Sequence, residues 1–462
     1  MSLRQARIPL LISAIILIGS VAFWASVSWD SSSIRGEAAA HSSMPADATQ
    51  PPNTNPPVAL PFEYTLWLHN KSLDELGGQA RLVDCFHRIT PQPYMVCVIA
   101  GRMDGPWEIH VSTIHDPTPK IFQSPQADSD TGEHMAIYFA LTHAVATEAL
   151  LRYRLFAKKG HDPFPPNKDG QATLALSLLD ANRPYQHELA VYTCLSDRFW
   201  FEFNGSDDHR RKQLRVLENW LWYFQEMGAE HFYLVFDFIN PEYLAASMKV
   251  LQPYIDQGMI TLAHAHARDH RPFLFQVALE NYFLHFARGH TKWLAMLDVD
   301  EYLQLMDQGQ ALRGLKAYID EVVTKDPSIT VVEFPGIFWD MPLRNNHGIT
   351  EPRDIIWHSE RNNQRKSGGL LGMKGVYHTE KVRATWVHLA HQYYGKALWL
   401  HPFTEGRLDH FRRLGHGLYD SLWRHRDDGL DLGALVQDAT FRDLWDALAD
   451  RSKAPDQTQK KS

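Results

Sequence analysis

From about residue 187 onward, two kinds of apolar pattern alternate along the chain. Continuous apolar runs of strand length are followed by longer segments in which apolar residues recur every three or four positions. Glycine follows the helical segments, where it favours termination. This alternation predicts a mostly parallel sheet with helices in the crossovers. The predicted strands are residues 188–195, 231–238, 259–265 and 291–300, and the predicted helices are residues 210–228, 242–255 and 271–289.

Residues 61–185 show a different pattern of shorter apolar runs separated by turn residues. Runs at 62–69, 94–101, 107–114 and 172–179 predict a small β-rich accessory region. The chain has 3 cysteines. They allow one disulfide, Cys85–Cys97, with Cys194 outside it.

The N-terminus has no such alternation. Residues 8–29 form an uncharged apolar run that is long enough to span a bilayer, behind a basic tail of residues 1–7. The positive-inside rule then predicts a single-pass type II membrane protein, with the rest of the chain in the Golgi lumen of a eukaryote or on the periplasmic face of a bacterium. A cleaved signal peptide is the alternative. Residues 30–60 have the composition of a flexible stem, and residues 451–462 that of a disordered tail.

The net charge of the chain bears on whether it binds nucleic acid. The 462-residue chain has a formal net charge of −8, and its basic residues are scattered. A nucleic-acid partner is therefore not expected.

One group of acids stands out at the end of a predicted strand. Asp298 and Asp300 end the apolar run that begins at Thr291, and Glu301 follows them directly. Residues i and i+2 of a strand share a face, so both aspartates are expected to converge on one Mg²⁺ or Mn²⁺ ion bound to a diphosphate. Asp237 ends another predicted strand, and ligands of such sheets bind beyond the carboxyl ends. The alternatives are a solvated turn and a phosphotransferase of the haloacid-dehalogenase kind.

Several blocks resemble glycosyltransferase family 92, whose members are nucleotide-sugar-dependent and have the GT-A fold. The resemblance covers roughly residues 187–415. It implies a Rossmann-like, mostly parallel sheet flanked by helices over residues 186–450. The blocks are residues 230–237, 251–262, 280–303 and 372–382, with the Trp-Val-His at 386–388 and the Leu-Asp-His-Phe-Arg at 408–412.

The resemblance also implies roles for single residues. Asp237 would hold the nucleoside or ribose of the donor. Asp300 would be the main metal ligand, and Asp298 would bind the metal through water or the donor ribose. Glu301 would orient the acceptor or support the neighbouring ligands. Lys374 could neutralise a phosphate, its alternative being a solvated strand lysine.

Two late histidines match the family, and one of them is expected to complete the metal site. His388 follows a strand-like segment and is preferred as the ligand, whereas His410 lies beside Arg412, which would serve the donor phosphates. Inverting transfer needs a general base. Asp340 and Glu333 lie in the corresponding segment, and Asp340 is preferred.

The resulting expectation is a Mn²⁺- or Mg²⁺-dependent enzyme that transfers a sugar, galactose by family analogy, from a UDP donor to a glycan hydroxyl with inversion. Some positions depart from the family pattern: Asn219 replaces a glutamate, Trp339 a glycine and Phe411 a tyrosine. A catalytically silent, glycan-binding scaffold of the same fold is therefore the alternative.

Overall fold

The computed structural model describes the central part of the chain with gaps. The predicted tail, anchor, stem and C-terminal tail all lie outside the described residues, as does the predicted strand at 172–179. In the part that is described, no helix is long and apolar enough to cross a membrane. The described residues are 64–67, 80–88, 93–101, 107–113, 116–123, 136–142, 151–156, 185–196, 207–237, 241–266, 272–306, 314–340, 360–362, 373–386, 389–411 and 435–436.

An 8-stranded sheet forms the centre of the fold, in the order β1-β10-β9-β8-β11-β16-β13-β19. The first five strands in this order are mutually parallel, as the alternating pattern predicts. Strand β16 is antiparallel to both of its neighbours, and β19 pairs in parallel with β13. The strands are β1 (Tyr64–Trp67), β8 (His187–Ser196), β9 (His231–Asp237), β10 (Ile260–His266), β11 (Thr291–Met296), β13 (Ile329–Phe334), β16 (Lys374–His378) and β19 (Lys396–Trp399).

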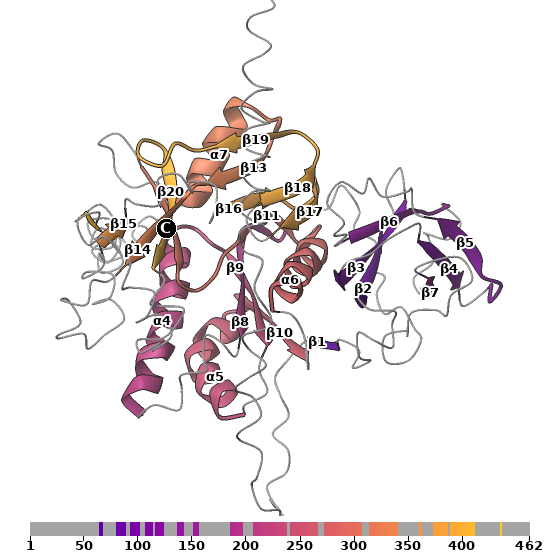
Figure 1. Ribbon diagram of the computed structural model, residues 1–462, viewed down its shortest axis with the longest axis horizontal. Helices are drawn as coiled ribbons and strands as arrows, with labels where there is room; N and C mark the ends of the chain where they lie inside the picture. Colours follow the sequence, from indigo (N-terminus) through magenta and orange to yellow (C-terminus); the bar gives the residue numbers. More distant parts are fainter. Residues whose placement is uncertain are drawn as a thin grey trace, which may run out of the picture. The chain divides into compact units, whose positions relative to one another are not determined.

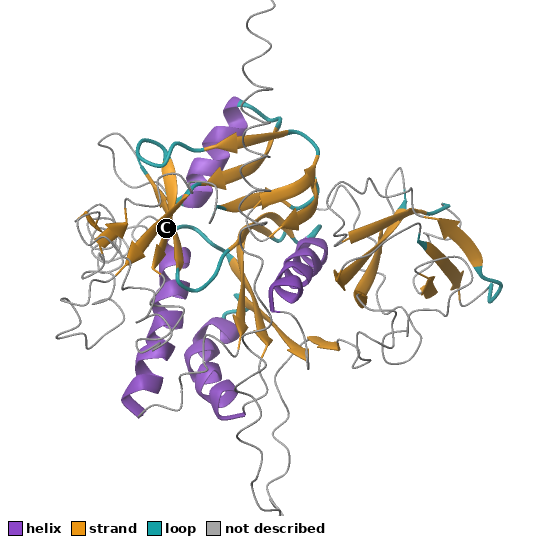
Figure 2. Ribbon diagram, in the orientation of Figure 1, coloured by secondary structure: helices purple, strands orange, loops and turns teal. Residues whose placement is uncertain are grey.

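Helices cover both faces of this sheet (Figures 1 and 2). Helices α4 (Asp207–Glu226), α5 (Pro241–Asp256) and α7 (Leu315–Lys325) share a core with the outward residues of one face, among them Val191. Helix α6 (Pro272–Ala287) packs on the opposite face with neighbours such as Tyr192. After α4 and α5 the backbone turns at Gly228 (φ 96°) and Gly258 (φ 70°), which is why glycine ends both helices.

A separate 5-stranded sheet has the order β12-β20-β14-β15-β21. Its strands are β12 (Glu301–Leu305), β14 (Gly336–Asp340), β15 (Glu360–Asn362), β20 (Gly406–Phe411) and β21 (Leu435–Val436). Strands β17 (Val382–Trp386) and β18 (Leu389–Tyr393) form an antiparallel pair. Since β12 starts five residues after β11 ends, the chain passes from one sheet to the other at the acid group.

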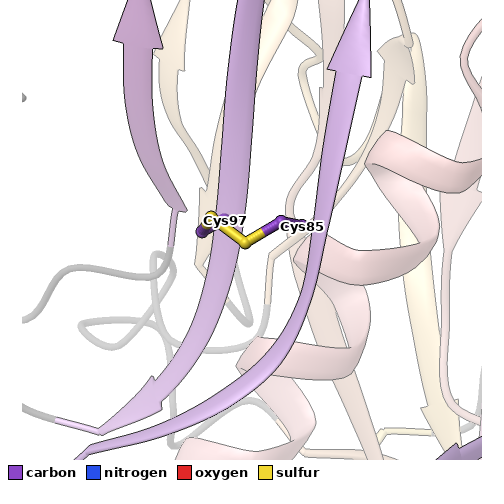
Figure 3. Close-up of a disulfide and its surroundings, with 2 residues drawn as sticks. All are labelled: Cys85 and Cys97. Carbon is purple, nitrogen blue, oxygen red and sulfur yellow. A yellow bond between two sulfur atoms is a disulfide. The ribbon is translucent and has the colours of Figure 1, made fainter. Parts of the chain in front are cut away.

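The predicted accessory region contains two 3-stranded antiparallel sheets, β2-β3-β6 and β5-β4-β7. Cys85 and Cys97 lie directly opposite each other on β2 and β3 and form the predicted disulfide (Figure 3). Phe86 beside the disulfide shares a core with α6. The strands are β2 (Ala80–Arg88), β3 (Tyr94–Gly101), β4 (Glu108–Thr113), β5 (Lys120–Gln123), β6 (Ala136–Ala140) and β7 (Leu151–Phe156).

Strand β1 pairs differently from the rest of residues 61–185. It lies parallel to β10 at the edge of the large sheet, with Tyr64 opposite Ala263. Its four residues therefore belong by hydrogen bonding to the α/β sheet and not to the accessory sheets.

Candidate functional site

The two aspartates lie in a turn and not on a strand. Strand β11 ends at Met296, and β12 begins at Glu301, whose backbone N–H donates to the Asp298 carbonyl at 3.0 Å. The expectation that alternation along a strand brings both carboxylates to one face was therefore wrong, because neither aspartate lies in a strand. The turn instead gives Asp298 and Asp300 different exposure, with 39% of one side chain accessible and 6% of the other.

Lys374, the first residue of β16, lies at the centre of the site. Its side chain is 2% exposed, so the alternative of a solvated lysine was wrong. The ammonium Nζ donates to Asp298 Oδ2 at 3.3 Å and is 3.6 Å from Glu301 Oε2 and 3.9 Å from Glu280 Oε1. Burial by itself lowers the pKa of Lys374, but the three surrounding carboxylates outweigh it and raise that pKa.

Glu301 is a buried acid that organises the turn. Its Oε2 accepts the backbone N–H of Asp298 at 2.9 Å, and its own carbonyl accepts the indole N–H of Trp220 at 3.1 Å. Burial raises the pKa of Glu301 to about 8, although Lys374 opposes the shift. The side chain supports its neighbours from within, which is consistent with the supporting role that the sequence suggested.

His410 lies opposite Glu301 in the β12–β20 pair. Its Nε2 is 3.3 Å from Asp300 Oδ2, and its Nδ1 is 3.6 Å from Glu301 Oε1. Burial lowers the pKa of His410, but the carboxylates of Asp300, Glu301 and Asp298 together outweigh it, and the net shift is upward. The structure therefore brings His410 to the acid group, while His388, the preferred ligand, and Arg412 lie outside the described residues.

Two further members of the site come from α6 and escaped the sequence analysis. Gln276 donates to Asp298 Oδ1 at 3.2 Å and to Glu280 Oε1 at 3.4 Å. Burial raises the pKa of Glu280 to about 7. The signal in the sequence was a pair of polar residues four positions apart in a largely apolar helix, which places both on one side of it.

The remaining candidates lie on other strands. Asp237 ends β9 and Asp340 ends β14, and the structure describes the backbone of both but not their side chains. Glu333 is buried on β13, where its Oε1 accepts the backbone N–H of Ala390 at 3.2 Å. Burial raises the pKa of Glu333 to about 8. No contact recorded among the described residues joins Glu333 to Asp298 or Asp300.

Trp339, which departs from the family pattern, is buried in the second sheet. Its indole N–H donates to Asp409 Oδ1 at 2.6 Å, and its ring stacks on Phe411 at 5.3 Å. Arg407 pairs with the same Asp409 oxygen at 2.8 Å. The substitution thus fills the core between β14 and β20 instead of lining a surface loop.

The site has more carboxyl groups than basic side chains. Four carboxyl groups, those of Glu280, Asp298, Asp300 and Glu301, meet one lysine and one histidine. The raised pKa values of the two buried glutamates are the consequence of this excess and of burial. Within the described ranges, no three His, Cys, Asp or Glu side chains form a group that could hold a metal ion by themselves.

Comparison with known proteins identifies the segment that carries this site. Residues 209–435, about half of the chain, match the family described as glycosyltransferase family 92. The match runs from α4 to β21. No curated protein matches the chain significantly.

Proposed function

The chain belongs to glycosyltransferase family 92 through residues 209–435, and we propose that it transfers a sugar from a UDP donor, with UDP-galactose as the first candidate. The family supports glycosyltransferase activity with a nucleotide sugar and a glycan acceptor as partners. The sugar, the metal and the stereochemistry belong to the proposal. The family match also favours a glycosyltransferase over the phosphotransferase alternative.

The observation that carries the proposal is the gathering of four carboxyl groups, two of them aspartates, at the point where β11 passes into β12. Buried like charges are costly, so carboxyl groups this close keep their protons or share a cation. A nucleotide diphosphate is itself an anion and binds beside carboxylates only with a cation between them. The position agrees with the proposal, because ligands of parallel sheets bind beyond the carboxyl ends of the strands.

The carboxylate oxygens present suit Mn²⁺ or Mg²⁺, and Mn²⁺ also accepts imidazole. Such ions are commonly held by one or two carboxylates plus substrate phosphates, so a group of three protein ligands is not required. Asp300 would hold the ion with Asp298 and His410 beside it. When bound, the ion would offset the charge of the departing UDP. Lys374 keeps Asp298 in place, and Glu301 holds the backbone of the turn.

For the general base, the burial of Glu333 makes Asp340 the preferred candidate. A base must reach the acceptor hydroxyl in its deprotonated form. Glu333 is buried within a central strand, and burial raises its pKa to about 8, so it keeps its proton at neutral pH. Asp340 ends β14, where the chain leaves the second sheet.

A membrane anchor at residues 8–29, with the enzyme in the Golgi lumen or periplasm, stays part of the proposal.

Release of UDP from a panel of UDP-sugars tests this function. The full chain should release UDP from one of them in the presence of Mn²⁺ or Mg²⁺, and EDTA should abolish the release. Asp300→Asn should lower the rate by about 100-fold or more, as loss of a metal ligand does. The matched control is Asp320→Asn, an exposed aspartate on α7. If wild type binds UDP but turns over no donor with any acceptor, the silent scaffold replaces the enzyme.

A further inference from the structure

Lys374 and the three acids around it, Glu280, Asp298 and Glu301, form what we call the Lys374 cluster. Asp298 is its accessible acid, and protein groups hold both of its carboxylate oxygens. Asp298 Oδ1 accepts from Gln276 at 3.2 Å, and Oδ2 accepts from Lys374 at 3.3 Å. Its side chain is 39% exposed, whereas those of Lys374, Glu280 and Glu301 are 2%, 3% and 2% exposed. Asp298 is thus the member of the cluster that can meet a ligand, and its orientation depends on two donors.

Both of those donors share a second partner. Glu280 Oε1 is 3.4 Å from Gln276 Nε2 and 3.9 Å from Lys374 Nζ. Glu280 therefore contacts each of the two groups that hold Asp298 and fixes them from the buried side. We propose that Glu280 is a positioning residue that orients the Asp298 carboxylate through Gln276 and Lys374.

The helix that carries Glu280 is itself held firmly. Asn281, the next residue, donates to the Thr385 carbonyl at 2.9 Å and accepts the Thr385 backbone N–H at 3.0 Å. This pair of hydrogen bonds to β17 restrains both rotation and sliding of α6. Tyr282 packs against Phe86 at 5.1 Å, next to the disulfide on β2. The position of Glu280 is therefore set before any ligand arrives, as a preorganised site requires.

The expected consequence follows from this arrangement and rests on the proposed function. Because Glu280 is buried behind its partners, it contacts no ligand itself and acts through Asp298. Its loss should weaken binding of the donor nucleotide through disorder of one carboxylate. Glutamine has nearly the shape of protonated glutamate, so Glu280→Gln should fold. The amide cannot hold the lysine by charge, and Lys374 and Gln276 lose their common anchor.

The test measures the affinity of UDP with Mn²⁺ by calorimetry on the folded full chain, together with hydrogen exchange of residues 297–301. Glu280→Gln should weaken UDP binding about tenfold or more and speed exchange of this turn. Glu218→Gln, an exposed glutamate on α4, is the matched control and should change neither. Gln276→Ala should have the same direction of effect. Adding it to Glu280→Gln should cost less than the two single losses combined, because both act on one carboxylate.

The outcomes separate this inference from the proposed function. If wild type binds no UDP, the proposed function fails, and exchange of residues 297–301 still decides the role of Glu280. If UDP binds to Glu280→Gln as tightly as to wild type, with exchange unchanged, the inference is overturned alone. If a smaller fraction of folded protein fully explains the loss of UDP affinity, the inference is also overturned. Should Glu280→Gln not fold, Gln276→Ala gives the deciding measurement in the same two assays.

Discussion

Two buried cations near α6 show how differently a protein can hold a positive charge. Lys374 is surrounded by carboxylates within 3.3 to 3.9 Å. Arg288, immediately after α6, is held by neutral groups. It donates to the Thr379 carbonyl at 2.8 Å, to the Tyr94 hydroxyl at 2.9 Å, to the Tyr138 hydroxyl at 3.5 Å and to the Val382 carbonyl.

The difference distinguishes a buried cation that stabilises the fold from one that belongs to a binding site. The planar fork of Arg288 matches several fixed acceptors and ties β3 and β6 to the segments after β16. Its hydrogen-bond acceptors among the described residues are neutral oxygens. Burial lowers the pKa of the guanidinium, but the neighbouring tyrosines and the nearby Glu380 carboxylate outweigh it and raise that pKa. The Lys374 cluster has more carboxyl groups than basic side chains and one accessible carboxylate. Removal of Arg288 should therefore harm stability, and removal of Lys374 should mainly harm binding.

The largest change in stability is expected for Arg288→Met. This change leaves two carbonyls and two hydroxyls buried without their donor, which should lower the free energy of unfolding by about 3–5 kcal/mol. Urea denaturation measures the loss. Lys292→Met, which removes a half-exposed pair with Glu188, is the control and should cost about 1 kcal/mol or less. UDP affinity per folded Arg288→Met molecule should equal that of wild type, and a loss there would break the distinction.

Lys374→Met should show the opposite division. Its stability loss should be about 1–3 kcal/mol, smaller than that of Arg288→Met, because the two buried glutamates can be protonated when their partner is gone. Burial already raises the pKa of Glu280 to about 7 and that of Glu301 to about 8. UDP affinity, measured by calorimetry with Mn²⁺, should fall about tenfold or more. Unchanged UDP affinity would mean that Lys374, like Arg288, serves to stabilise the fold.

Glu333→Gln should leave UDP affinity unchanged and change how stability depends on pH. Burial raises the pKa of Glu333 to about 8, so the native carboxyl stays protonated where the unfolded one, with a pKa near 4.3, is ionised. Its stabilising contribution is present at low pH and is lost as pH rises to about 8, at up to about 1.4 kcal/mol per pH unit. Urea denaturation between about pH 5 and about pH 8 should show a flatter slope for the variant. Parallel slopes for both proteins would refute the assignment.

Local pattern was enough to predict much of the fold. The apolar runs and glycine stops predicted β8 to β11 and α4 to α6, since each signal lies within one element. The Cys85–Cys97 disulfide was also predicted and is confirmed. The strand at β1 was predicted, but the sheet it belongs to could not be assigned from local sequence, because it pairs with β10, about 200 residues later in the chain.

The sequence named the acids of the site but missed the two residues of α6. Asp298, Asp300 and Glu301 stand together in the sequence, whereas Lys374 and His410 were candidates only through the family resemblance, because Lys374 comes from an antiparallel strand and His410 from the second sheet. Glu280 and Gln276 are invisible for a further reason. A polar residue in an apolar helix reads as an exposed position, and only the packing of α6 between the sheet and β2–β3 reveals that Glu280 is buried.

The central claim, that this group of acids binds a nucleotide diphosphate with a cation, is tested most directly by calorimetry of UDP on the full chain. Four titrations are needed: wild type and Asp300→Asn, each with Mn²⁺ and with EDTA. Wild type should bind UDP with Mn²⁺ and lose about 100-fold or more of its affinity in EDTA or on substitution of Asp300, while the thermal midpoint without ligand is unchanged. Equal UDP affinity in all four titrations would contradict the account.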